Sequence, residues 1–338
     1  MSDRHVKVAI VKGTQYSATL EALELMEDVI KVPTEEDIVI LPNLLTTMQS
    51  EIVNTDYRVC LAVMDFYKEV FGINETSCII MGGTTHGNPA NSLKALENNH
   101  YLEDNRNWKL FDNSEDLPGK WFKIYEQGGE GITELALGKK LIESGYVISV
   151  PKFKTHDVLG LTLSLKNLMG GLVAARNIEG TIIAEKPTNV CPLMHGFGFR
   201  RPHQLSDEEN TSTSKLCLAI NLVRMVKIKQ PTLAVIDGVN AMEGNGPLSG
   251  IKKELGLIIA SNDFIAADIV ATYIAGMKPE DMQYILQAGK LGLGEYRLAN
   301  IEIVGENLEE VIDPFIPHRL FNRAIFKETE IDILRNST

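Results

Sequence analysis

Four motifs that would assign an enzyme class outright are missing from the 338-residue sequence. It has no Walker A phosphate loop, no GxGxxG turn directly after a strand pattern, no GxSxG nucleophile elbow and no HExxH zinc motif. The cysteines are also too far apart for a CxxC pair, so the spacing typical of a zinc ribbon or an iron–sulfur cluster is missing. Buried thiols in a reducing cytoplasm are the simplest interpretation.

Long apolar runs and excess positive charge are lacking as well. No run approaches the roughly 20 residues that cross a bilayer, and the N-terminus MSDRHVKVAIVKG lacks the apolar core of a signal peptide. Lys and Arg number 33 against 45 Asp and Glu, a net charge of −12. An acidic surface disfavours binding to nucleic acids and to anionic membranes. We therefore expect a cytoplasmic protein that binds neither, although a local basic pocket for a small anion remains compatible with this charge.

Short runs rich in Val and Ile recur along the chain with helical patterns between several of them. The runs occupy residues 6–11, 37–42, 78–83, 146–151, 232–237, 255–261 and 301–305. Such runs predict strands buried on both faces, and their alternation with helices predicts a largely parallel sheet. Helices are expected at residues 56–71, 131–144 and 214–229 and from residue 263 onward.

The expected fold is therefore an α/β fold with two lobes, built from largely parallel sheets flanked by helices. We expect the first lobe at residues 1–230, a smaller lobe at 231–310, and a C-terminal segment, 311–338, that packs back on the first lobe. Residues 99–129, with both tryptophans, predict a β-rich excursion or lid. Residues 176–213 show little periodicity, and a loop of that length is typically functional or mobile.

The segment PKFKTHDVLGLTLSLKNLMGG, residues 151–171, begins where a predicted strand ends, the edge at which ligands collect in open α/β sheets. Its basic and hydrogen-bonding side chains favour a carboxylate or phosphate ligand, and an imidazole can move protons near neutral pH. The candidates for binding and catalysis are Lys152, Lys154, Thr155, His156, Lys166 and Asn167. The alternative is an exposed basic loop; the interleaved leucines favour burial, and hence function.

Two more polar loops follow predicted strands. MGGTTHGNP, residues 81–89, places His86 just past a strand end, where it could be a general base, a metal ligand or a satisfied loop residue. DGVNAMEGNGP, residues 237–247, offers Asp237 and Asn245 for a substrate or a cation, and ordinary turn formation explains the same residues equally well.

The fourth constellation is HGFGFRRPH, residues 195–203. A mobile loop that carries arginines, Arg201 among them, could close over an anionic substrate, and a solvated loop is the alternative. Further along, Asp263 is expected first as a helix cap and second as a binding group.

At these residues the sequence resembles the family catalogued as domain of unknown function 362 (DUF362). The resemblance rests on residues 151–171, on VIDGVNAMEGNGP (235–247) and on SNDFIAAD (261–268), and it covers most of the chain. Some members carry a ferredoxin-like cysteine motif. This chain does not, so we expect no iron–sulfur cluster.

A more distant resemblance is to the nickel-pincer lactate racemases, which have one histidine after a Gly-Thr strand end and a second ten positions before the lysine that carries the pincer nucleotide. Here His86 follows GGTT, and His156 lies ten positions before Lys166. The resemblance implies a lactate-racemase-like fold, His203 as a metal ligand, and a nickel-pincer-type nucleotide or a divalent metal as cofactor.

Taken together, these features predict an enzyme that acts on a small or medium anionic metabolite by proton transfer, as racemases, epimerases and isomerases do. His86 and His156 would be acid/base partners in a cleft between lobes, Lys166 would hold an anionic group or a cofactor, and Asp237 and Asn245 would line the opposite wall. One alternative is a protein that binds a cofactor or metabolite without catalysis. Another is a redox-accessory protein. The sequence leaves the oligomeric state open, with a homodimer as one alternative.

Overall fold

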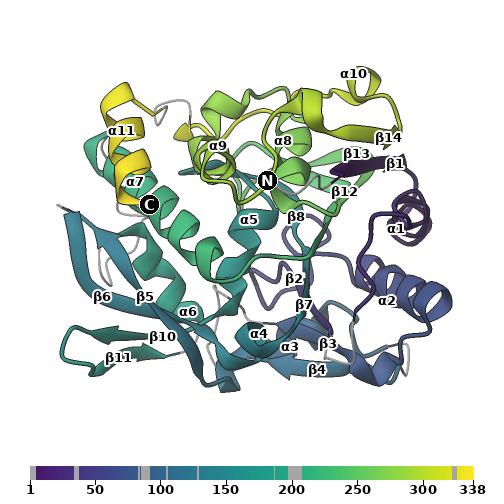
Figure 1. The fold of residues 1–338 in the computed structure, drawn as a ribbon, viewed down its shortest axis with the longest axis horizontal. Helices are drawn as coiled ribbons and strands as arrows, with labels where there is room; N and C mark the ends of the chain where they lie inside the picture. Colours follow the sequence, from purple (N-terminus) through teal and green to yellow (C-terminus); the bar gives the residue numbers. More distant parts are fainter. Residues whose placement is uncertain are drawn as a thin grey trace.

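The computed structural model describes residues 5–33, 38–82, 84, 92–103, 106–127, 129–185, 187–196, 208–321 and 326–338. Within these ranges the chain forms one large sheet, one smaller sheet and the helices packed around them (Figure 1).

The large sheet has ten strands, eight of them in the order β14-β1-β13-β12-β7-β2-β3-β4, with β8 beside β12 and β9 beside β8. The strands are β1 (Lys7–Lys12), β2 (Ile38–Pro42), β3 (Cys78–Gly82), β4 (Lys109–Asp112), β7 (Tyr146–Val150), β8 (Lys152–His156), β9 (Gly160–Thr162), β12 (Leu233–Glu243), β13 (Ile251–Ser261) and β14 (Glu302–Gly305).

Most neighbours in this sheet are parallel. The run β12, β7, β2, β3 and β4 pairs in parallel throughout, and β1 pairs in parallel with β14. The exceptions are β13, which lies antiparallel between β1 and β12, and the antiparallel pair of β8 and β9. The predicted α/β fold with a largely parallel, helix-flanked sheet is confirmed, and all seven predicted strands are present.

The large sheet is buried on both faces. Successive side chains of a strand point to opposite faces, and in this sheet each face packs into its own hydrophobic core. Val8 and Ile10 of β1 lie in one core, whereas Ala9 and Val11 lie in the other. The second core is covered by α1 (Gln15–Glu24), α2 (Tyr57–Phe71) and α3 (Ser92–Asn98). The first is covered by α5 (Ser164–Asn167), α7 (Glu208–Ile228), α8 (Phe264–Ile274) and α9 (Gln283–Lys290). Figure 1 shows α1 and α2 grouped away from α7, α8 and α9.

The small sheet has the order β11-β10-β6-β5 and is antiparallel. Its strands are β5 (Pro118–Glu126), β6 (Gly129–Gly138), β10 (Leu172–Asn177) and β11 (Ile182–Glu185). With β4 it supports the expected β-rich excursion at residues 99–129.

The helix expected at residues 131–144 is wrong. The chain instead forms β6 and then the short helix α4 (Lys139–Glu143). Ile132, expected to face inward, is 62% exposed, while Leu135 is buried. Burial alternates in the first part of β6, which is the two-residue period of a strand, and pairing with β5 and β10 holds the segment extended.

The stretch at residues 176–213 has more regular structure than its sequence indicates. It contains the end of β10, β11, α6 (Pro187–Val190) and the start of α7, and residues 197–207 lie outside the described ranges.

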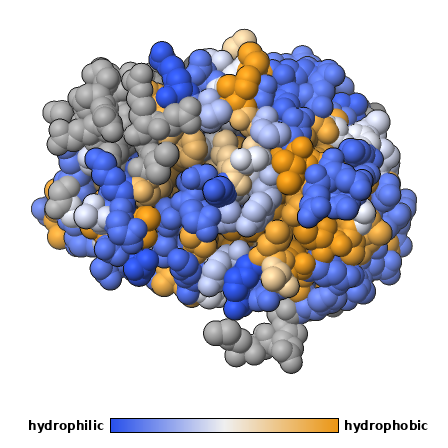
Figure 2. Space-filling view, turned by 90° about the horizontal axis from the view of Figure 1, so that it is seen from above, coloured by the Kyte–Doolittle hydropathy of each residue, from blue (hydrophilic) through white to orange (hydrophobic). Residues whose placement is uncertain are grey.

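The remaining helices are α10 (Leu308–Val311) and α11 (Glu328–Ser337). α11 lies against α7, where Lys215 Nζ donates to Glu330 Oε2 at 3.0 Å. Strands from residues 1–230 and from residues 231–310 share the large sheet, and the division into lobes stays a prediction. No helix in the described ranges is long and apolar enough to cross a membrane. Hydrophilic residues cover much of the face drawn in Figure 2, with apolar patches between them.

Candidate functional site

Buried oxygens without a hydrogen-bond partner gather where the parallel strands of the large sheet end. Two of these oxygens are Oδ1 of Asn43, the residue directly after β2, and Oγ1 of Thr84, which comes just after β3. The third is Oδ1 of Asp237. The backbone N–H of Asp237 donates to Pro151 O at 2.9 Å, which places this residue beside the end of β7. Each lacks a partner among the described residues. Unsatisfied buried polar atoms are rare in proteins, and a group of them marks a place for a ligand or ordered water. The carboxyl edge of the sheet is therefore the candidate site.

Strand β8 carries a row of basic side chains along this edge. Lys152, Lys154 and His156 are two residues apart, so they project from the same face of the strand, and all three are buried. Lys152 Nζ donates to Asp237 Oδ2 at 2.9 Å, and Lys154 Nζ donates to Val53 O at 2.6 Å. Burial, together with the positive charges of Lys166 and Lys152, holds the pKa of Lys154 well below its usual range.

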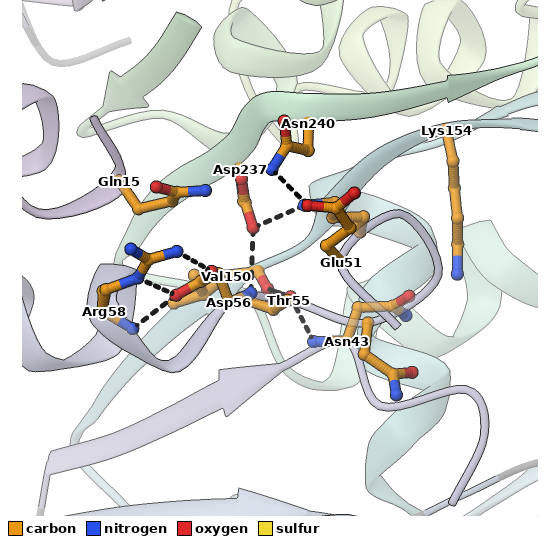
Figure 3. Close-up of polar contacts among 12 residues, drawn as sticks. Gln15, Asn43, Glu51, Thr55, Asp56, Arg58, Val150, Lys154, Asp237 and Asn240 are labelled. Atoms are coloured by element: carbon orange, nitrogen blue, oxygen red, sulfur yellow. Dashed lines mark hydrogen bonds and ion pairs between the residues drawn. The ribbon is translucent and has the colours of Figure 1, made fainter. Parts of the chain in front are cut away.

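Asp237 anchors the first end of this row. Its Oδ2 also accepts the backbone N–H of Asp56 at 2.9 Å, at the start of α2, so it joins β12 to β8 and α2. Figure 3 shows Asp237 between the side chains of Gln15, from the start of α1, and Asn240, which donates to Glu51 Oε2 at 3.1 Å.

His156 lies at the other end of the row with its proton position fixed by the backbone. The N–H groups of Val158 and Leu159 donate to Nδ1, at 3.1 and 3.3 Å, which requires a lone pair there and places the proton of the neutral ring on Nε2. Asp157 Oδ1 lies 3.1 Å from His156 Nδ1. The Val158 N–H donates to this oxygen as well as to Nδ1, so we infer that it is shared between the two acceptors and that no proton lies on Nδ1. Burial and the nearby charge of Lys166 lower the pKa of His156 well below its usual value, which favours the neutral ring.

Lys166 differs from every buried lysine of the described chain. Lys7, Lys152, Lys154 and Lys215 each donate to a carboxylate or a carbonyl. Lys166 is partly buried, and no described residue accepts a hydrogen bond from its amine. Burial lowers its pKa, and the Asp157 carboxylate opposes this shift. An amine held in this way is suited to an anionic ligand or to proton transfer.

Asn167, the next residue, fixes the carboxyl-terminal end of α5 to the sheet. Its Nδ2 donates to Leu41 O at 2.8 Å and to Ser149 Oγ at 3.1 Å, and its Oδ1 accepts from Asn43 Nδ2 at 3.1 Å. Both polar atoms of the Asn167 side chain are therefore engaged in hydrogen bonds with other residues of the protein. Asn43 is a residue that the sequence analysis missed; its position directly after a strand was the available signal.

Two further histidines lie within electrostatic range of His156, since the charges of His195 and His318 both act to lower its pKa. His195 Nδ1 lies 2.8 Å from Ser214 Oγ, and His318 Nδ1 accepts the Leu320 N–H at 3.0 Å. Neither was predicted as a site residue. No local pattern marks His318, which tertiary packing brings close.

The other predicted residues occupy less central positions. Thr155 is buried, and its Oγ1 donates to Gly244 O at 2.9 Å, which holds the turn after β12 against β8. Asn245 lies exposed in that turn. His86, Arg201 and His203 lie outside the described residues.

A metal centre is not formed by the part of the chain that the structure describes, where no group of three or more His, Cys, Asp or Glu side chains could hold an ion. Lys166 itself is flanked by Leu163, Leu165 and Leu168, all buried and apolar. These residues alone do not fit the nickel-bearing nucleotide that the racemase resemblance implies.

An open pocket of about 230 Å³ lies at the opposite edge of the sheet, near the starts of β1, β7 and β12. Its lining includes His5, Asp28, Lys31, Tyr146, Thr232 and Asn262. None of the predicted site residues lines it, and ligands of open α/β sheets bind at the other edge.

Comparison with known proteins decides the family. The family model described as domain of unknown function (DUF362) matches residues 38–273. The chain belongs to this family. The match includes β8, α5, Asp237 and Asp268, and the predicted membership is confirmed.

One curated relative is a thylakoid-associated protein of Synechocystis, 30% identical over 169 residues. The match covers 50% of this chain and 44% of the relative, so it spans less than half of the relative's length.

Solved structures with a similar chain trace include the lactate racemase apoprotein of Thermoanaerobacterium thermosaccharolyticum, with a TM-score of 0.44 and 11% identity, over 82% of this chain and 59% of that one. A Thermotoga maritima protein gives a TM-score of 0.41 and 11% identity, over 84% of this chain and 59% of that one.

Proposed function

We propose that the chain is an enzyme that binds a small anionic metabolite at the carboxyl edge of the large sheet and moves a proton on it, as isomerases and racemases do. The ligand would present a carboxylate or a phosphate to the basic row of β8 and to Lys166. The main support is that the amine of Lys166 has no hydrogen-bond acceptor among the described residues, whereas the amine of every fully buried lysine there has one.

The state of each group suggests its role. Burial lowers the pKa of the Lys166 amine, so a larger share of it is uncharged near neutral pH than of an ordinary lysine, and we assign it the role of proton acceptor. His156 would donate the hydrogen bond from Nε2–H to the oxygen on which negative charge develops, since its Nδ1 lone pair is already used. This assigns His156 a different task from the general base that its sequence position suggests. His86 stays a candidate for the second acid/base group.

The test is exchange of carbon-bound hydrogen in D2O. Wild-type protein would be incubated with a panel of 2-hydroxy acids and sugar phosphates, and loss of the C–H signal next to the carbonyl or hydroxyl carbon followed by proton NMR. We expect Lys166→Met to lower the exchange rate by about 100-fold or more, and His156→Asn by about 10- to 100-fold, typical of the loss of an acid/base or a charge-stabilising group.

Lys120→Met is the matched control, because Lys120 is an exposed lysine on β5, away from the site. It should exchange like the wild type. Full exchange by Lys166→Met would refute the assignment of Lys166. Tight binding of a panel compound without any exchange would instead favour a protein that carries the ligand without catalysis.

A further inference from the structure

Asp268, on helix α8, lies under the residues that lead into Lys166. Its Oδ1 accepts the N–H of Ser164 at 2.8 Å, and its Oδ2 accepts the N–H of Leu165 at 2.9 Å. Both oxygens of one fully buried carboxylate are thus committed to consecutive N–H groups at the start of α5. No other described side chain accepts a hydrogen bond from these two N–H groups.

The short length of α5 makes this contact important. The helix has four residues and no side-chain cap of its own, and a helix of one turn is not stable in isolation. Its orientation must therefore come from tertiary contacts. Asn167 fixes the carboxyl-terminal end, as described above, and Asp268 fixes the amino-terminal end.

The helix that carries Asp268 is itself held firmly. Helix α8 spans eleven residues, is capped by Asp263 and is buried along nearly all of its length. Asp268 is therefore a buried carboxylate attached to a rigid element. Burial raises the pKa of Asp268 to about 7, and the N–H groups of Leu165 and Ser164 act in the opposite direction. Packing alone does not account for a carboxylate with this burial cost, because an apolar side chain would fill the same space without it.

We propose that Asp268 is a positioning residue that holds α5 so that the amine of Lys166 faces the ligand of the candidate site. The proposal rests on the proposed function of that site. The carboxylate does not touch the ligand: it fixes the backbone of residues 164 and 165, and through them the point from which the lysine side chain starts. Each of its two oxygens accepts one of two neighbouring N–H groups. An amide side chain has only one such oxygen, and an apolar side chain has none.

The test measures the reactivity of Lys166 directly and needs no substrate. Wild type and Asp268→Asn would be trace-labelled with acetic anhydride from pH 6 to 11, with peptide mass spectrometry reporting the extent at each lysine. An asparagine keeps one acceptor but turns an NH2 group toward the other N–H. We expect the midpoint of Lys166 labelling to rise by about one pH unit or more toward the ordinary lysine value of 10.5, and its labelling at pH 7.5 to fall about tenfold.

Asp263→Asn is the matched control, since Asp263 also accepts two consecutive N–H groups, those of Ile265 and Ala266, at 3.0 Å each. Both of these N–H groups donate to Oδ1, and an asparagine oxygen can accept them in the same way, so this variant should keep the α8 cap and the Lys166 midpoint. An unchanged midpoint in Asp268→Asn, or an equal shift in both variants, would overturn the proposal.

Should Asp268→Asn not fold, Ser164→Pro removes the N–H from the other partner of the same contact. Proline is tolerated at the first position of a helix, and Leu163 before it is extended, with φ −140° and ψ −165°. The same upward shift is expected, and its absence would count against Asp268. A shift in labelling without hydrogen exchange on any panel compound would keep the positioning role and reject the proposed function; exchange without the shift would do the reverse.

Discussion

His156 shows how backbone contacts can set the chemistry of a single residue. The sequence predicts a histidine near a strand end, which leaves its ionisation and its tautomer open. In the folded chain two N–H groups occupy Nδ1, and burial favours the uncharged ring. Both properties come from residues 158 and 159 and from the packing around β8, so neither could be deduced from the spacing of His156 and Lys166.

The pKa of His156 predicts a specific pH dependence of stability. Its folded pKa lies below the ordinary value of 6.5, so the stability that goes with the neutral ring is present above pH 6.5 and is lost as the pH falls below that value. In His156→Asn this loss disappears, because asparagine accepts the same N–H groups without titrating. We expect the stability advantage of the wild type to shrink between pH 7 and pH 5, by up to about 1.4 kcal/mol per pH unit.

Urea unfolding at several pH values measures this difference. His5→Asn is the control, since the side chain of His5 is 58% exposed. It should follow the wild-type pH dependence. A wild-type and a His156→Asn curve that run parallel from pH 7 to pH 5 would show that His156 is not held neutral.

At the scale of elements, strands with runs of Val and Ile were predictable because their burial on both faces leaves a strong composition signal. The caps of α2 and α8 were predictable for a local reason, since Asp56 and Asp263 accept N–H groups within their own first turns. Strand β6 was not, because residues 131–144 suit a helix locally and only pairing with β5 and β10 makes them extended.

The turn between β8 and β9, which brings Lys154 opposite Thr162, depends on Gly160. Its φ is +86°, and a Cβ there would lie 2.8 Å from the ring of Phe321. Gly160→Ala should therefore destabilise the protein by more than the roughly 1 kcal/mol expected for the backbone conformation alone. Gly180→Ala is the matched control, with a φ of +84° and nothing within 4 Å of a Cβ.

Chemical denaturation of both variants separates the two costs. The difference between them measures the clash in the β8–β9 turn, and we expect Gly160→Ala to be the less stable by about 1 kcal/mol or more. Equal losses of stability would mean that the turn moves to relieve the contact with Phe321 at little cost. The turn, whose Val158 and Leu159 N–H groups bind His156, would then not hold that side chain in place.

At the scale of the whole molecule, the buried pair of Lys152 and Asp237 connects parts of the chain that lie 85 residues apart. Both side chains are fully buried, with no exposed surface. Removing one partner leaves an unpaired charge inside the protein, so Lys152→Met should lower the free energy of unfolding by about 3–5 kcal/mol. The double variant Lys152→Met/Asp237→Leu should recover much of that loss.

Thermal and urea unfolding of the single and double variants test this coupling. Lys139→Met is the control, because Lys139 pairs with Glu143 and both side chains are more than half exposed, at 52% and 64%, and such pairs contribute about 0–1 kcal/mol. If the double variant were as unstable as the sum of the two single variants, the two charges would not stabilise each other.

The sequence alone determined the strands, the main helix caps, the family and the segment that carries the basic row, because these depend on composition and on contacts within a few residues. Tertiary structure decided which of those basic groups are already paired: Lys152 finds Asp237, Lys154 finds Val53, and Lys166 finds no acceptor in the described chain. It also brought Asn43, His318 and Asp268 to the site from distant positions. Burial and pairing depend on what packs around a side chain, and the spacing of residues along the chain does not contain that information.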